Sequence, residues 1–360
     1  MSLFQIDMLP AREGDCLWVE YGDPARPRRI LIDGGRQVAY TTLKKRIAAL
    51  PPDQRQFELL ILSHVDADHA EGLLHMLKDP DVPITFKDVW FNGYDHLEKP
   101  RTLEWMGAKQ GEAFTRGIHA KGWKWNAAFD GKSVVIPDDG ILPVKVLADG
   151  MRLTLLSPTW DKLENMEPVW KKELQKAGLL EPVAPPDSDI PDLEGFGALT
   201  VEEVEEAAAS VFKPDDSEAN GTSIGVLAEF DGRTAVLTGD AHADVIAASL
   251  AKLRHANGSP ARVDAFKLSH HGSRGTHSIP LLAEIACSRF LISTDGSRHR
   301  HPHVESLART VKHTGPGIEF YFNFKSVQAA AWDVERLKRR YSYQTIFPKP
   351  GEEGMARISL

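Results

Sequence analysis

Short apolar runs alternate with amphipathic stretches along most of the chain, which is the pattern of an α/β protein. In the N-terminal third, the short runs are rich in apolar and β-branched residues and are separated by glycine and proline, so they predict strands. These strands are expected at residues 4–8, 16–21, 29–32, 58–62 and 88–91. Apolar residues at helical spacing predict helices over residues 41–50 and 70–77.

The same alternation returns in the C-terminal half of the chain. Strands are expected at residues 223–229, 234–237, 263–268 and 290–293. Helices are expected at residues 244–253 and 304–312, between and after those strands. From residue 318 to residue 332 and onward the pattern is β-rich, and it carries the basic run LKRRYS.

The composition changes between residues 161 and 216. The run EPVAPPDSDIPDLEGFG is rich in proline and acidic residues, and the segments on both sides of it have helical patterns. Such a run forms a poor core, so we expect a helical and acidic insertion within one domain that spans residues 1–360.

Composition and charge indicate where in the cell the protein works and which partners suit it. The start of the chain lacks a basic end followed by an apolar run, no stretch is long enough to span a membrane, and the two cysteines are far apart. These features predict a cytoplasmic protein with no membrane association. The net charge of −8 argues against a general nucleic-acid coat. It leaves room for an anionic substrate, because bound metal ions supply local positive charge.

The first chemical motif is LILSHVDADHAEG, in which an apolar strand runs directly into two histidines and two aspartates. His64 and Asp66 are two residues apart and can face one metal ion, whereas Asp68 and His69 can face a second ion nearby. Imidazole and carboxylate groups suit zinc or a harder divalent ion.

Further ligand-type residues follow later strands. Asp240 comes after the apolar strand of AVLTGDA, where Gly239 lets the backbone turn and the carboxylate is well placed to bridge two ions. Eight of the 14 histidines lie in three short stretches, each close behind a predicted strand. These histidines are His64, His69, His270, His271, His277, His299, His301 and His303. Because strand ends tend to meet at one edge of a sheet, we expect a metal site there.

Together these motifs resemble the metallo-β-lactamase fold superfamily. The closest likeness is to the branch that contains the hydrolase domain of the DNA-uptake competence channel and phosphorylcholine-esterase-like proteins. The likeness rests on His-x-Asp-x-Asp-His, a later Gly-Asp and a His-His-Gly-Ser, and extends from IDMLPAREGDCLWVEYGD and LIDGG through DGMRLTLLSP and NGTSIGVLAEF to HPH. It implies a four-layer αβ/βα sandwich with the site at one edge.

The resemblance also implies a set of ligands for two divalent metal ions, Zn or Mn. One ion would take His64, Asp66 and either His270 or His271, and the choice between the last two stays open. The other ion would take Asp68 and His69 with a late histidine, for which His301 is the best match. Asp240 would bridge the two ions.

Several neighbouring residues receive supporting roles, Asp33 and His96 from the resemblance and the others from their positions beside the expected ligands. Asp33 in LIDGG matches an early aspartate that supports a ligand, and His303 would cap a helix or touch substrate. His96 is the one histidine near the position of a further family ligand, and it is either a ligand or a supporting group. Ser273 and Arg274 could hold an anionic substrate, or could form a turn that merely positions the histidines.

The function that follows is a metal-dependent hydrolase, specifically a phosphodiesterase or nuclease that uses a dinuclear site and a bridging hydroxide. Asp68 would help to orient that hydroxide, and whichever of His270 and His271 is not a ligand could protonate the leaving group. The substrate would be a phosphodiester, in either a nucleic acid or a small molecule.

Two alternatives remain open at this stage. One is hydrolysis of a non-phosphate bond such as a thioester, lactone or β-lactam. The other is a regulatory or effector module, in which the acidic insertion and the basic C-terminal run contact a protein partner of a bacterial operon-type system. The sequence identifies no such partner, and it fixes neither the metal nor the oligomeric state.

Overall fold

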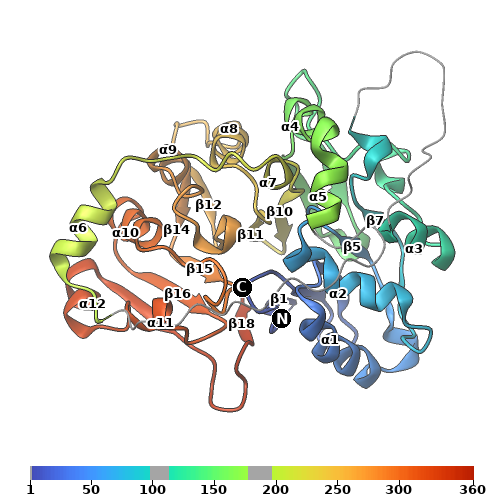
Figure 1. Ribbon diagram of the computed structural model, residues 1–360, viewed down its shortest axis with the longest axis horizontal. Helices are drawn as coiled ribbons and strands as arrows, with labels where there is room; N and C mark the ends of the chain where they lie inside the picture. The colour runs from blue at the N-terminus through green and yellow to red at the C-terminus, as the bar shows by residue number, and fades with distance from the viewer. Residues whose placement is uncertain (1, 98–112, 177–196) are drawn as a thin grey trace.

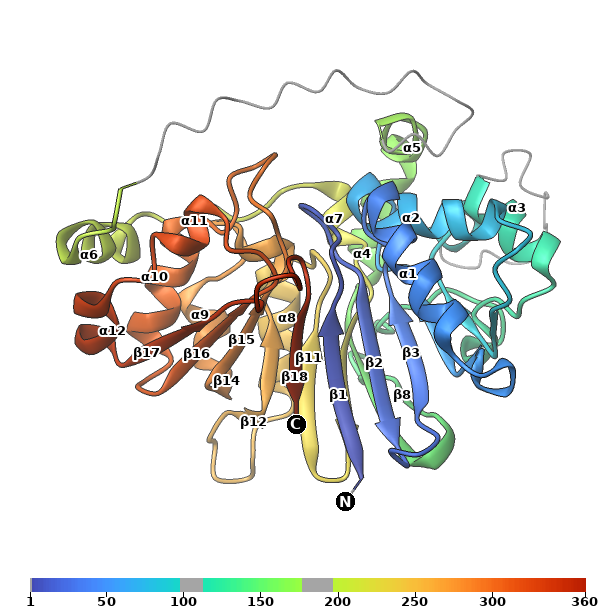
Figure 2. The same cartoon turned by 90° about the horizontal axis from the view of Figure 1, so that it is seen from below.

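Two mixed β-sheets face each other in the middle of the molecule, and helices cover the outer face of each (Figure 1; Figure 2). The computed structural model describes residues 2–97, 113–176 and 197–360. The layer order is helices, sheet, sheet, helices. The predicted four-layer αβ/βα sandwich is therefore confirmed.

The first sheet has six strands in the order β18-β1-β2-β3-β5-β7. Strands β18, β1, β2 and β3 pair antiparallel, whereas β3, β5 and β7 pair parallel. Their bounds are β1 Leu3–Met8, β2 Leu17–Gly22, β3 Arg28–Ile32, β5 Leu59–Ile61, β7 Val89–Trp90 and β18 Ala356–Ser359. Beside this sheet, β4 and β6 form a two-stranded ladder, with bounds Gln56–Phe57 and Thr85–Phe86.

The second sheet has eight strands in the order β17-β16-β15-β13-β11-β10-β9-β8. It is antiparallel from β8 to β11 and parallel from β11 to β17. Its bounds are β8 Val144–Val146, β9 Arg152–Ser157, β10 Gly225–Phe230, β11 Arg233–Leu237, β13 Ala265–Lys267, β15 Arg289–Ile292, β16 Ile318–Phe322 and β17 Tyr343–Ile346. A separate parallel pair consists of β12 Ala261–Val263 and β14 Ile285–Cys287.

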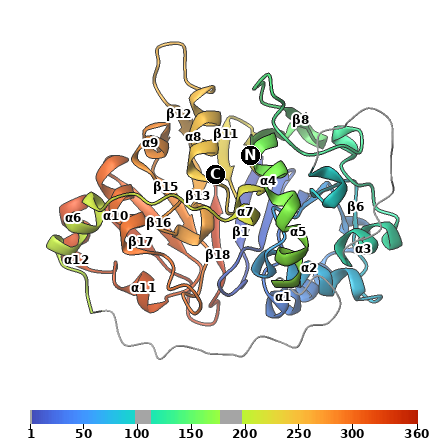
Figure 3. The same cartoon turned by 45° about the horizontal axis from the view of Figure 1, so that its top comes forward.

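Helices from each half of the chain cover the sheet of that half (Figure 1). The helices on the side of the first sheet are α1 Gln37–Ala49, α2 Ala67–Lys78, α3 Ala113–Lys121, α4 Trp160–Met166 and α5 Trp170–Lys176. Those on the side of the second sheet are α6 Val201–Ala209, α8 Ala243–Ala251, α9 Ile279–Ala283, α10 Val304–His313, α11 Val327–Ala330 and α12 Glu335–Tyr341. The short helix α7, Glu218–Gly221, lies at the junction between the two halves (Figure 3).

The alternation of side chains along each strand divides the interior into three apolar cores. In β2, Leu17 and Val19 point between the sheets, whereas Trp18 points toward the helices of the first layer. In β13, Phe266 joins the core beneath the outer helices and Ala265 joins the core between the sheets. Central strands such as β5 and β13 are therefore buried on both faces, which explains their nearly continuous apolar sequences, whereas the edge strand β8 is largely exposed.

Most of the predicted elements are present, with one main difference. The C-terminal segment was expected to be β-rich, but α11 and α12 interrupt it, and the basic run LKRRYS lies mainly in α12. Residues 161–216 contain α4, α5 and α6, as their helical patterns predict. The run EPVAPPDSDIPDLEGFG lies outside the described residues except for its last glycine, so its role as an insertion stays a prediction.

Within the described ranges, no helix combines the length and apolar character that crossing a membrane requires.

Candidate metal centre

The strand ends that carry the predicted ligands meet at one edge of the two sheets, the upper edge in Figure 2. The first group follows β5. His64 comes three residues after that strand, Asp66 is the N-cap of α2, and Asp68 and His69 lie in its first turn. The Asp66 side chain makes no capping hydrogen bond. A strand that turns at once into a helix thus presents four ligand-type side chains together.

Asp240 enters the same region from the second sheet. It follows β11 through Gly239, whose φ of 53° lies in the left-handed region. A Cβ atom on Gly239 would lie 2.8 Å from the Ser63 Cβ, so glycine is required here both for the turn and for space. The Asp240 side chain is almost fully buried, and its backbone N–H donates to Ser223 Oγ at 3.2 Å.

The double histidine follows β13 in an unusual backbone conformation. His270 has a φ of 48° and His271 a φ of 54°, so two consecutive residues with side chains are left-handed. The His270 N–H donates to Gly239 O at 3.2 Å, and Ser269 Oγ donates to Ala241 O at 2.7 Å, which ties the turn to the Asp240 loop. Such strain persists where the surroundings enforce it, and it is concentrated at functional sites.

These segments bring five acidic and imidazole side chains into contact. His69 Nε2 lies 3.4 Å from Asp240 Oδ1 and 3.3 Å from His271 Nε2. His271 Nε2 lies 3.5 Å from Asp240 Oδ2 and 3.3 Å from Asp68 Oδ2. Asp15 joins them, because ligand atoms of Asp15, His69, Asp240 and His271 all lie within 4.8 Å of one another. We call these five residues the metal-site cluster.

A second group of predicted ligands surrounds the cluster. His270 Nε2 lies 3.9 Å from Asp240 Oδ2, and the His64 ring centroid lies 4.3 Å from that of His69. His64 Nε2 lies 3.7 Å from Asp66 Oδ2. The buried His301 ring lies 5.0 Å from the His270 ring, between ring centroids.

The pairing of these groups differs from the expected one. We expected a late histidine, His301, beside Asp68 and His69, but the structure places His271 there and His301 beside His270. Both His270 and His271 point Nε2 toward Asp240, and the assignment of one of them as a proton donor stays a prediction.

Four of the imidazoles are held from behind by an oxygen atom. His69 Nδ1 donates to Asp33 Oδ2 at 2.8 Å, and His270 Nδ1 donates to Asp215 Oδ2 at 2.6 Å. Ser63 Oγ lies 3.1 Å from His64 Nδ1, and Asp15 Oδ1 lies 3.4 Å from His271 Nδ1, which is an ion-pair contact without hydrogen-bond geometry. Each ring thereby directs Nε2 inward, which is how outer carboxylates orient metal-binding histidines.

The donor set fits divalent metal ions. His64 Nε2 and Asp240 Oδ1 are buried and have no hydrogen-bond partner among the described residues. A buried polar atom without a partner is costly, and a buried carboxylate more so, unless a cation is supplied. Imidazole nitrogens and carboxylate oxygens are ligands that both zinc and manganese accept.

Attraction between opposite charges dominates the cluster when no metal is bound. Burial alone would lower the pKa of His69 and His271, but the neighbouring carboxylates, Asp240 first among them, together outweigh burial and raise the pKa of both well above 6.5. Burial would raise the pKa of Asp240 and Asp68, but the neighbouring imidazoles hold both well below 3.8. Burial also lowers the pKa of His301 well below 6.5, which leaves it neutral, as a metal ligand must be.

These shifts predict that metal affinity rises with pH. His69, His270 and His271 have raised pKa values, so near neutral pH each must lose a proton before it can bind an ion. In the metal-free protein, the stability from their protonated pairs is fully present below pH 6.5 and is lost as pH rises through the raised values.

Manganese titrations at about pH 6, 7 and 8 should therefore give progressively lower dissociation constants. A dissociation constant that does not change over this interval would contradict the charge pairing described above.

The remaining predicted residues surround the centre or lie apart from it. Asp33 is fully buried and accepts hydrogen bonds from Ser63 N and Ser63 Oγ, both at 2.7 Å, in addition to His69. His96 contacts other groups: Nε2 donates to Gly131 O at 3.2 Å and the ring packs against Trp125. No contact between His96 and the metal-site cluster is found in the described part of the chain.

The turn after the double histidine has both structural and exposed residues. Ser273 N donates to His270 O at 2.8 Å, and Ser273 Oγ accepts from Gly275 N at 3.4 Å. Arg274 N donates to His303 Nδ1 at 3.0 Å, so His303, at the N-cap position of α10, fixes the turn and makes no side-chain cap. The Arg274 guanidinium is 57% exposed and lies 3.4 Å from Glu305.

Three residues of the centre were missed by sequence reasoning. Asp15 follows β1 in AREGD, and a Cβ on Gly14 would lie 1.7 Å from Asp68 O, so glycine packs this loop against α2. Lys267 is a charged residue within the buried strand β13, and a lysine in an otherwise apolar predicted strand could have indicated a buried ion pair. Asp215 has no local signal, because its role depends on a contact with His270 across 55 positions.

Asp215 gives a direct test of the outer carboxylates. Its Oδ2 also accepts from Asn220 Nδ2 at 2.8 Å, so Asp215→Asn places an amide where two donors converge and disturbs His270. We expect metal affinity to fall about 10-fold to 100-fold. The exposed neighbour Asp216, changed to Asn, is the matched control and should bind metal normally. Equal affinities of the two variants, measured by metal titration, would contradict this role.

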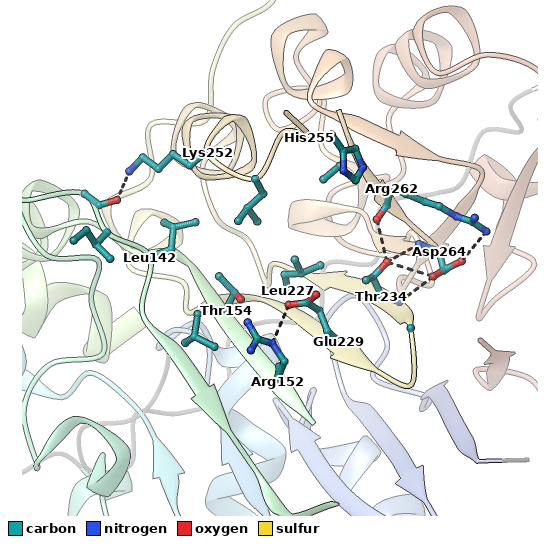
Figure 4. Close-up of a pocket in the computed structure, with 16 residues that line it drawn as sticks. Leu142, Arg152, Thr154, Leu227, Glu229, Thr234, Lys252, His255, Arg262 and Asp264 are labelled. Atoms are coloured by element: carbon teal, nitrogen blue, oxygen red, sulfur yellow. Dashed lines mark hydrogen bonds and ion pairs between the residues drawn. The ribbon is translucent and has the colours of Figure 1, made fainter. Parts of the chain in front are cut away.

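A pocket with a volume of about 620 Å³ lies away from the centre, on the outer face of the second sheet (Figure 4). Its wall includes Thr234, at the opposite end of β11 from Asp240. Arg152 in this pocket lies 3.8 Å from Glu229, and none of the metal-site cluster lines it. It is therefore separate from the candidate metal centre.

Fold and site together define a four-layer αβ/βα protein with a cluster that could hold metal. Comparison with known proteins adds little to this. No family model matches the chain, and no curated protein matches it. Among solved structures, a mutant of the CmlA beta-hydroxylase is similar with a TM-score of 0.38 and 13% identity, over 99% of this chain and 54% of that one. The chain thus spans about half the length of that protein, and we draw no functional conclusion from the similarity.

Proposed function

We propose that the protein is a metal-dependent phosphodiesterase with a centre for two divalent ions on either side of Asp240. The observation that carries this proposal is the position of Asp240. His69 approaches one carboxylate oxygen, and His270 and His271 approach the other, each with its Nδ1 side held by a carboxylate. A buried carboxylate between inward-facing imidazoles is the arrangement that bridges two cations.

The contacts divide the ligands into two sets. Asp68, His69 and His271 would hold one ion. His64, Asp66 and His270 would hold the other, with His301 next to His270. When bound, two such ions lower the pKa of a coordinated water and neutralise charge on phosphoryl oxygens.

The residues of the chain have further tasks. Asp68 is 18% exposed at its side chain, so it lies at the boundary between the buried cluster and solvent, where it can accept a hydrogen bond from the attacking water. Asp33, Asp15 and Asp215 keep the imidazole Nε2 atoms directed at the centre.

Basic groups around the centre favour an anionic substrate. Arg274 and Arg298 have side chains that are 57% and 51% exposed, on the two loops that carry His270, His271 and His301. Their contacts with Glu305 and Glu13 are long, at 3.4 and 4.0 Å, and the arginine side of each pair is exposed to solvent, so each contact contributes little. Either guanidinium can therefore turn to a phosphate oxygen, which favours a phosphodiester over a neutral bond.

A panel of substrates tests the proposal. Purified protein with Mn²⁺ or Zn²⁺ should hydrolyse bis-p-nitrophenyl phosphate or single-stranded DNA, and should leave nitrocefin and a thioester intact. Asp68→Asn should lower the rate of hydrolysis about 100-fold or more, because it weakens the binding of one metal ion and no longer orients the attacking water.

The control is Asp81→Asn, an exposed aspartate shortly after α2, which should retain full activity. Turnover of the thioester or of nitrocefin, with no cleavage of either phosphodiester, would replace the proposal by its non-phosphate alternative. A metal-free, inactive protein that binds a partner would favour the regulatory role.

A further inference from the structure

Lys267 is a fully buried lysine in the core between the two sheets. In β13, Phe266 faces the outer helices, so Lys267 faces the opposite way, toward the first sheet. Its strand neighbours are Leu237 on β11 and Leu291 on β15, both in the apolar core between the sheets. A lysine is almost never buried in this way unless its charge is paired.

The charge of Lys267 is directed at the metal-site cluster. Its Nζ pairs with Asp15 Oδ2, lies 3.3 Å from Gly239 O and lies 4.0 Å from Asp240 Oδ1. Among the described residues, it is the only lysine or arginine within 4.0 Å of Asp15 or Asp240. The carbonyl contact at Gly239 further fixes the loop that positions Asp240.

Asp15 connects this lysine to a predicted ligand. One of its oxygens pairs with Lys267, and the other lies 3.4 Å from His271 Nδ1. Burial alone would raise the pKa of Asp15, but Lys267 and His271 outweigh it and lower that pKa to about 2. Asp15 therefore lies between Lys267 and the Nδ1 side of His271, and its position within the cluster would also allow it to bind an ion.

We propose that Lys267 is a resident cation of the metal centre, which balances Asp15 and Asp240 before any metal binds. Asp15, Asp33 and Asp240 are each at most 2% exposed, so their negative charges need compensation inside the protein. An ammonium group supplies one positive charge that does not leave when metal is removed. The same charge opposes the entry of divalent ions. The inference rests on the metal centre of the proposed function but not on the reaction.

The test compares Lys267→Met with the wild type in chelator and in saturating Mn²⁺. Melting temperature should fall by about 10 °C in chelator, because Asp15 and Asp240 lose their cation, and by clearly less with metal. By linkage, the native variant must then bind Mn²⁺ more tightly, by about tenfold, as a titration would show. Lys252→Met, an exposed lysine on the outer face, is the matched control and should change neither quantity.

Two outcomes would overturn the inference. Equal losses of melting temperature with and without metal would make Lys267 an ordinary core residue. Weaker Mn²⁺ binding by Lys267→Met would also contradict an opposing charge. If Lys267→Met does not fold, the double variant with Asp15→Asn decides: it should recover most of the stability, because neither charge is then left alone. No recovery would overturn the inference.

The result is independent of the proposed reaction. A wild-type protein that binds Mn²⁺ but cleaves no phosphodiester, together with tighter binding by Lys267→Met, would remove the proposed function and leave the resident cation. Cleavage of a phosphodiester by the wild type, together with unchanged Mn²⁺ affinity of Lys267→Met, would support the proposed function and remove the resident cation.

Discussion

Replacing Asp240 by asparagine is expected to lower phosphodiester hydrolysis on the order of 10³-fold and to reduce the bound metal from two ions to one or none. The carboxylate lies between His69 on one oxygen and His270 and His271 on the other, and it is almost fully buried. An amide has the same shape but no charge, and only one of its two terminal atoms can bind a cation. Both ions would lose affinity together.

Asp244→Asn is the matched control for this change. Asp244 lies four residues further on, in the first turn of α8, with a side chain that is 72% exposed. Its replacement should leave both metal content, measured by elemental analysis, and hydrolysis near wild type. An Asp240→Asn protein that keeps two ions and full activity would show that Asp240 does not bridge.

The second large effect is expected at Asp33, which supports the centre and is not itself a ligand. Its two oxygens accept from Ser63 N, Ser63 Oγ and His69 Nδ1. In Asp33→Asn, the amide NH₂ must face one or more of these donors. If it faces His69 Nδ1, the proton of that ring moves to Nε2, where it blocks a metal ion. We expect metal affinity to fall about 100-fold, measured by titration with Mn²⁺.

A change of stability alone could imitate this result, and Asp7→Asn controls for it. Asp7 is as buried as Asp33 and accepts from Arg357 at 2.8 Å, but it lies on the outer face of β1, where its ion-pair partners are Arg46 and Arg357 and not residues of the centre. The Asp7→Asn variant should have a lower melting temperature than the wild type but the same affinity for Mn²⁺. The role of Asp33 would be refuted if the two variants lost stability equally and bound Mn²⁺ equally well.

Much of the candidate centre was predictable because its acidic and imidazole side chains follow strands. The residues after β5 and β11 carry His64, Asp66, Asp68, His69 and Asp240, and the structure brings them together at one sheet edge. The apolar run and the ligands are adjacent in sequence, so a local pattern contains the relevant information. The same reasoning gave the alternation of strands and helices over most of the chain.

Other features depend on contacts that no local pattern contains. The placement of His271 rather than His301 beside Asp68 follows from two left-handed residues in the turn after β13. The support of His270 by Asp215 depends on the path of a long segment back to the site. The C-terminal helices were misread because aromatic and basic residues within a β-like composition hide short helices.

Anomalous X-ray diffraction from Mn²⁺-loaded crystals would show whether this cluster holds two divalent ions. We expect two peaks about 3.5–4 Å apart on either side of the Asp240 carboxylate. One peak should contact His69 and His271, and the other should contact His64 and His270. No peak beside Asp240 in crystals grown at saturating Mn²⁺ would contradict the account.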